Sequence, residues 1–184
     1  MTDSLHHEFA KNYLKELLSN FGQVETSYKL PRRVYEVDLW FNPSSRPINA
    51  GEELGLLGKV AATPCIFERF SEPVTVNQMC SLISKFFQVL ADLKRQAEQE
   101  NNSISEDELP KLWVITPTVS PEFLHGFGAI PDRENWGEGF YFLGWGFRIA
   151  FILIDQLPCT PETQSLRKFC EGIVPQKAIN EDED

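Results

Sequence analysis

The sequence predicts a single α/β domain built around a mixed central sheet. A helical hydrophobic period over residues 5–21 gives way to strict alternation over 34–41, and a long helical stretch separates two short apolar runs at 65–70 and 112–116. Because a helix that joins two neighbouring strands makes a right-handed crossover, the two apolar runs are expected to pair in parallel. The length of 184 residues suits one domain.

The N-terminal third predicts a helix at 5–21 followed by strands at 23–30 and 34–41. The helix has apolar residues every four positions, and the turn between the strands is Pro31-Arg32-Arg33. Alternation along 34–41 sorts the side chains onto two faces. One face carries Tyr35, Val37, Leu39 and Phe41, and the other carries Val34, Glu36, Asp38 and Trp40.

The middle of the chain predicts a buried strand at 65–70, the longest helix from 76 to about 100, and a central strand at 112–116 that is apolar on both faces. The expected buried stripe of the long helix consists of Val76, Met79, Cys80, Ile83, Phe86, Phe87, Leu90 and Leu93.

Towards the C-terminus, further strands are expected near 140–143 and 148–156, followed by a short helix that begins near Pro161. No linker is long enough to divide the chain. The predicted organisation is therefore one domain over residues 1–173 and an acidic, disordered tail over 174–184.

The net charge of −10 bears on the partners of the protein. An acidic surface repels the phosphate backbone, so the overall field disfavours tight, non-specific binding to nucleic acid and leaves such binding to a local basic patch. The four cysteines form no CxxC pair and are predicted to be buried free thiols. Such thiols suit a reducing compartment, and no signal peptide or uninterrupted apolar span is found, so we expect a cytoplasmic protein without a membrane partner.

Two carboxylates in apolar strands are the candidate functional residues. Asp38 lies in the middle of one predicted strand, and Glu68 lies in the run Cys-Ile-Phe-Glu-Arg-Phe. If the two strands are neighbours, these carboxylates converge into a site of the kind that Mg²⁺ or Mn²⁺ prefers, where a bound cation can activate water. The alternatives are a solvated face for Asp38 and an ion pair between Glu68 and a nearby Lys or Arg.

Several segments together resemble a cyanobacterial group of the recombination-promoting nuclease and transposase family, a branch of the PD-(D/E)XK nuclease-like superfamily. These segments are HHEFAKNYLKELL, YEVDLWF, TPCIFERF, LWVITPT, GFGAIPDRENWGEGFYFLG and IDQLPCTPET. The resemblance implies a restriction-endonuclease-like αβββαβ core with extra C-terminal strands. It also implies that Asp38 is the motif aspartate, that Glu68 is the acidic residue of the (D/E)XK element, and that Glu8 is the nearest acidic residue on the first helix.

The chain departs from the family pattern at the motif lysine. The position two residues after Glu68 is Phe70, and the adjacent Arg69 is expected to point to the opposite face of the strand. Three other lysines could replace it, namely Lys29, Lys59 and Lys85, and the sequence places none of them.

Two functions of different classes follow. The first is a metal-dependent DNA phosphodiesterase in which Asp38 and Glu68 hold Mg²⁺ or Mn²⁺, catalytically active or degenerate. The second is a catalytically silent protein-interaction module on the same fold, which forms a homo-oligomer or binds another protein. The missing lysine and the acidic charge favour the second, and aromatic residues within 140–147 could provide its contact surface.

Overall fold

A computed structural model describes residues 37–43 and 54–169 of the chain. The predicted helix at 5–21, the predicted strand at 23–30 and the acidic tail lie outside these residues. So do Glu8, Lys29, Glu36 and Cys170.

The described residues form an α/β fold around a six-stranded mixed sheet with the order β1-β2-β3-β6-β5-β4. The strands β2 and β3 pair in parallel, as do β3 and β6, whereas the other neighbours are antiparallel. The mixed sheet and the parallel pair across the long helix are therefore confirmed. The strands are β1 (Leu39–Phe41), β2 (Cys65–Arg69), β3 (Lys111–Thr116), β4 (Ile130–Pro131), β5 (Phe140–Phe142) and β6 (Ile149–Leu153).

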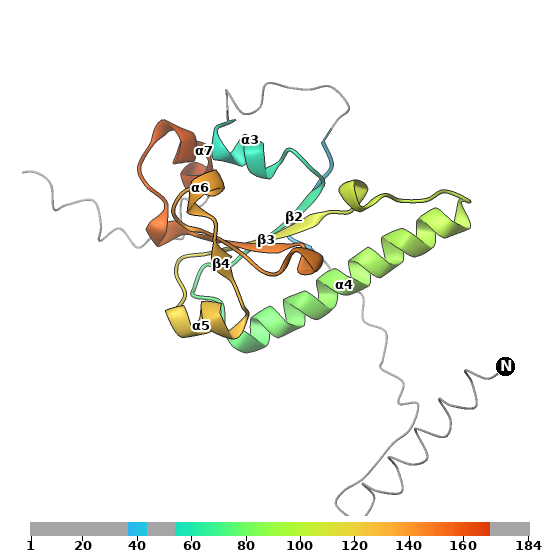
Figure 1. Ribbon diagram of the computed structural model, residues 1–184, viewed down its shortest axis with the longest axis horizontal. Helices are drawn as coiled ribbons and strands as arrows, with labels where there is room; N and C mark the ends of the chain where they lie inside the picture. The colour runs from blue at the N-terminus through green and yellow to red at the C-terminus, as the bar shows by residue number, and fades with distance from the viewer. Residues whose placement is uncertain (1–36, 44–53, 170–184) are drawn as a thin grey trace, which may run out of the picture. The chain divides into compact units, whose positions relative to one another are not determined.

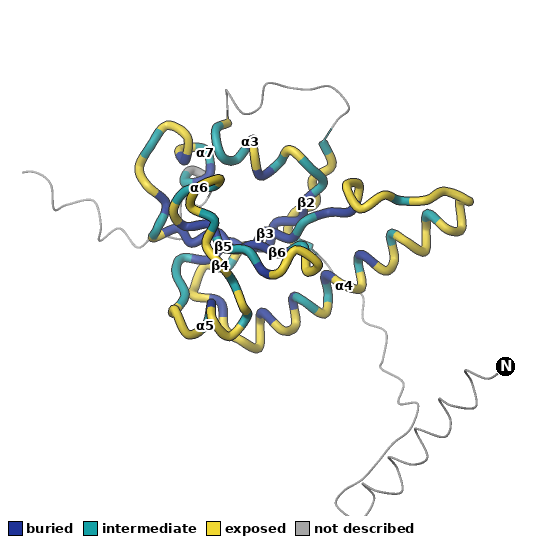
Figure 2. Tube along the Cα trace, in the orientation of Figure 1, coloured by how far each residue is buried: buried dark blue, intermediate teal, exposed yellow. Residues whose placement is uncertain are grey.

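The two central strands are buried along almost their whole length (Figure 2). Their sequences, KLWVIT and IAFIL, are apolar at consecutive positions, which is typical of strands covered on both faces. Their register pairs Trp113 with Ala150 on one face of the sheet and Val114 with Phe151 on the other, so that in each pair a large residue lies beside a smaller one. Both faces of the sheet therefore require a covering layer.

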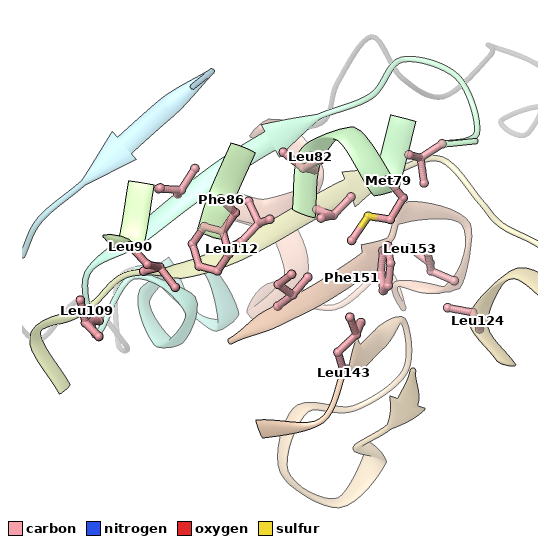
Figure 3. Close-up of a cluster of buried hydrophobic side chains, with 14 residues drawn as sticks. Met79, Leu82, Phe86, Leu90, Leu109, Leu112, Leu124, Leu143, Phe151 and Leu153 are labelled. Atoms are coloured by element: carbon pink, nitrogen blue, oxygen red, sulfur yellow. The ribbon is translucent and has the colours of Figure 1, made fainter. Parts of the chain in front are cut away.

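Helix α4 (Val76–Gln99) covers one face and joins β2 to β3 (Figure 1). Its start is fixed by a capping box in which Thr75 and Gln78 bond reciprocally. Met79, Leu82, Phe86 and Leu90 point from it into a core shared with Leu112 and Phe151 (Figure 3). The predicted stripe was partly wrong: Val76, Cys80 and Phe87 are exposed, and Leu82 belongs to the core instead.

The opposite face is covered by short helices, α3 (Leu56–Val60), α6 (Arg133–Trp136) and α7 (Pro161–Phe169) (Figure 1). Trp113 is the largest buried side chain on this face, where it contacts Trp136, Phe140 and Phe142. On the face of α4, the helix α5 (Pro121–Gly126) contributes Leu124 to the core. Within the described residues, no helix has both the length and the apolar character needed to cross a membrane.

Three short 3-10 turns complete the described chain: η1 (Glu106–Glu108), η2 (Trp145–Phe147) and η3 (Ile154–Gln156). The sequence patterns did not predict α5, α6 or β4.

The cysteines correct one prediction. Cys65 is a buried free thiol, as expected, but Cys80 and Cys159 are exposed free thiols. Cys80 follows the buried Met79 in α4, and a step of one residue turns a helix by about 100°, which is enough to carry it out of the core.

Burial raises the pKa of the Cys65 thiol to about 11. Because folding disfavours the thiolate, the stability that this group contributes is present at low pH and is lost as the pH rises through the folded-state value. Between about pH 9 and pH 11, we expect the free energy of unfolding of the wild type to fall by up to about 1.4 kcal/mol per pH unit more than that of Cys65→Ala. Urea denaturation at stepped pH measures this difference. In the control Cys80→Ala, which removes an exposed thiol, the free energy of unfolding should fall with pH as steeply as in the wild type. An equally steep fall in the wild type and Cys65→Ala would contradict the prediction.

Candidate metal and phosphodiesterase site

The two predicted carboxylates lie at the same end of two neighbouring strands. Leu39 of β1 pairs with Phe67 of β2 in an antiparallel ladder, and Asp38 directly precedes β1. The side chain of Glu68 lies on the face under α4, because Ile66, two residues before it, packs into the core that α4 covers.

Glu68 is buried near the C-terminal end of β2 and is paired with a lysine from α4. Its Oε1 atom lies 2.5 Å from Nζ of Lys85, and the two side chains are only 9% and 17% exposed, respectively. Lys85 directly precedes the core residue Phe86, so its aliphatic stem lies along the edge of the buried stripe while its ammonium group reaches the sheet. The pair compensates the charge of an otherwise costly buried carboxylate.

Asp38 was predicted to lie in the middle of a strand, but it directly precedes β1, which begins at Leu39. Its side chain is tied to the backbone of β2. Its Oδ2 accepts a hydrogen bond of 2.9 Å from the Arg69 N–H. The N–H of the next residue, Phe70, donates to the Ile115 carbonyl on β3, so the Arg69 N–H points the other way, towards β1. The carboxylate thus ends the β1–β2 ladder in place of a backbone carbonyl, which fixes its position although the residue is exposed.

Among the three candidate lysines, the structure brings Lys85 to Glu68. Lys59 lies in α3 on the opposite face of the sheet, where its ammonium group is 4.4 Å from the centre of the Trp136 ring and donates to the Asn135 carbonyl. Phe70 packs against the core under α4, so an apolar side chain occupies the expected lysine position. The sequence spacing could not identify Lys85, because the contact spans 17 residues.

The donor set fits a hard divalent cation that keeps some of its own water. Within residues 37–43 and 54–169, the hydrogen bonds described above engage one oxygen of each carboxylate and leave Asp38 Oδ1 and Glu68 Oε2 without a protein donor. Mg²⁺ is commonly held by one or two carboxylates together with water and substrate phosphate. The same described residues contain no group of three or more His, Cys, Asp or Glu side chains that could hold a metal, so any ion here depends on those extra ligands.

Comparison with known proteins assigns no family: no protein-family model, no curated protein and no solved structure matches the chain. The geometry of Asp38, Glu68 and Lys85, which we call the Glu68 site, is thus the basis for a functional assignment.

Proposed function

We propose that the chain is a metal-dependent DNA phosphodiesterase with a restriction-endonuclease-like core. The observation that carries the proposal is the position of Asp38 and Glu68 at the same end of the β1–β2 pair, with the ammonium group of Lys85 2.5 Å from Glu68. The order of β1, β2, α4 and β3, with an antiparallel pair followed by a parallel pair across the helix, supports such a core.

The three side chains of the Glu68 site have different roles in the proposed hydrolysis. Asp38 and Glu68 hold Mg²⁺ or Mn²⁺ through the oxygens that their protein contacts leave free. The cation, when bound, lowers the pKa of a ligated water and neutralises charge on the phosphate. Lys85 supplies a fixed positive charge beside Glu68, where it can orient the attacking water or stabilise charge that develops on the phosphate oxygens.

A Mn²⁺ titration by calorimetry tests this proposal without a choice of substrate. We expect the wild type to bind Mn²⁺ and Asp38→Asn to bind it at least tenfold more weakly, because the amide removes the charge of the carboxylate. The amide oxygen still accepts the hydrogen bond from the Arg69 N–H, so the end of the ladder is preserved.

The matched control is Asp107→Asn, which changes an exposed aspartate in η1, away from the sheet. It should bind Mn²⁺ as the wild type does. Unchanged affinity in a folded Asp38→Asn protein, as judged by circular dichroism, would refute the role of the acidic pair.

One observation favours a second function, a catalytically silent interaction module. Lys85 already compensates the charge of Glu68, so the site is electrostatically satisfied without a metal. The net charge of −10 adds to this case, because it opposes the approach of DNA. This function predicts no heat of Mn²⁺ binding in any of the three proteins and a dimer or complex in solution.

A further inference from the structure

Trp145 is the most exposed large apolar side chain of the described residues, with 95% of its surface accessible. Tryptophan is on average a highly buried residue, so nearly complete exposure needs a reason. Two further exposed aromatic residues stand beside it: Phe147 in the same turn and Phe87 on α4, whose rings meet edge to face at 6.2 Å. The three residues form what we call the Trp145 surface.

The turn that presents Trp145 is held firmly by its neighbours. Phe147 N–H donates to the Gly144 carbonyl, and Arg148 adopts a left-handed conformation with φ of 57°. The Arg148 guanidinium group then donates to the backbone carbonyls of Leu109, at 2.6 Å, and Pro110, at 3.2 Å. The indole ring therefore projects from a turn whose backbone is anchored, so the backbone loses little conformational entropy when a ligand stacks on the ring.

The surroundings of Trp145 are locally basic in an acidic protein. Hollows of about 410 and 240 Å³ flank the side chain, and their charged lining consists of three cations, Lys94, Lys111 and Arg148, and one carboxylate, Glu106. Glu106 lies 3.4 Å from both Lys94 and Arg148, and its contact with Lys94 is a long and solvent-exposed one that an incoming anion can replace. Charge complementarity therefore favours an anionic partner with a flat apolar face.

We propose that the Trp145 surface binds single-stranded nucleic acid, with a base stacked on the indole ring and phosphates against Lys94 and Lys111. An exposed aromatic ring next to cations is the arrangement on which single strands bind, and only an unstacked base can lie on such a ring. The choice of nucleic acid over other anions rests on the proposed phosphodiesterase function.

The position of this surface connects it with the Glu68 site. Lys85 and Lys94 lie nine residues apart on α4, which corresponds to about 14 Å along the helix and about half a turn around it. Phe87 and Lys94 line the hollow beside Trp145, so the same helix contributes residues to both sites.

Fluorescence anisotropy with a labelled thymidine oligonucleotide of about 12 nucleotides, in EDTA and about 50 mM NaCl, tests the inference. We expect Trp145→Ala to lower the affinity about tenfold and Trp145→Phe to retain most of it, because any aromatic face supports stacking. Lys111→Gln should weaken binding and reduce the slope of log affinity against log salt by about 1. The control Ile130→Ala, which removes an exposed apolar side chain of β4, should bind as the wild type does.

Three results would overturn the proposal: no binding by the wild type, equal affinity in Trp145→Ala, or an equal loss in Ile130→Ala. A fourth is a dimer that becomes a monomer in Trp145→Ala with unchanged oligonucleotide affinity, which would make the surface an interface between two copies. Because EDTA removes divalent cations, the outcome does not depend on the Glu68 site. Failure of Mn²⁺ binding and failure of oligonucleotide binding are thus separate results.

Discussion

Lys85→Met is expected to lower the free energy of unfolding by about 2–3 kcal/mol and to make the protein more responsive to Mn²⁺. Methionine keeps the volume of the stem but leaves Glu68 with an uncompensated charge under α4. Removal of one partner from a fully buried pair costs about 3–5 kcal/mol, and the residual exposure of this pair reduces that figure. With the ammonium group gone, no positive charge competes with a bound cation for the Glu68 carboxylate, so the cation gains a stronger electrostatic attraction.

Thermal unfolding with and without Mn²⁺ measures both effects. The wild type should gain less stability from saturating Mn²⁺ than Lys85→Met does, and Glu68→Gln/Lys85→Met should be close to wild type in stability and unresponsive to the ion. If Mn²⁺ leaves the midpoint of Lys85→Met unchanged, the pair is a structural ion pair and the silent module is the better assignment. If the changes in the free energy of unfolding caused by Glu68→Gln alone and Lys85→Met alone sum to the change in the double variant, the interaction between the two side chains contributes nothing to stability.

Gly55→Ala is expected to destabilise the protein by about 3 kcal/mol or more. Gly55 precedes α3 with φ of 56° and ψ of −130°, a conformation that is essentially restricted to glycine. A Cβ atom there would lie 2.7 Å from the Cα of Glu162 and would collide with the Glu162 carbonyl oxygen in α7. Because the obstacle is backbone, α3 and α7 would have to separate, which opens the core that contains Val60 and Leu166.

Gly128→Ala is the matched control for this effect. Gly128 also has a positive φ, of 63°, but a Cβ atom there would meet nothing within 4 Å. Its substitution should lower the free energy of unfolding by about 1 kcal/mol, from backbone strain alone. Urea denaturation of both variants measures the two costs. Equal costs would show that neither the collision with α7 nor the special backbone conformation of Gly55 adds to the cost of a positive φ.

The strong hydrophobic patterns of the sequence predicted the elements that build the sheet under α4. The limits of β2, α4 and β3 differ from the predicted ones by a residue or two, since each combines a clear period with a proline, a cap or a polar loop at its ends. The elements that were missed are short: α5 has six residues, α6 has four and β4 has two, so none gives a period that can be read.

The candidate site was predictable only in part. The pattern singled out Asp38 and Glu68 because each is a carboxylate in a predicted apolar strand, and the structure places the two at the same end of the β1–β2 pair. It could not select Lys85, whose contact with Glu68 depends on how α4 crosses the sheet. It also could not distinguish the buried Phe140 from the exposed Trp145, because both belong to the same aromatic run.

The position of β6 in the middle of the sheet has a consequence for synthesis of the chain. Leu112 of β3 pairs with Ile149 of β6, so the central ladder waits for 36 intervening residues to be made. Until β6 leaves the ribosome, the partly synthesised domain contains β2, α4 and β3, and one edge of the apolar strand β3 lacks its partner. Such an open edge is prone to pair with other chains, and pairing of this range slows folding. The nascent chain is therefore most vulnerable to aggregation between the synthesis of β3 and that of β6.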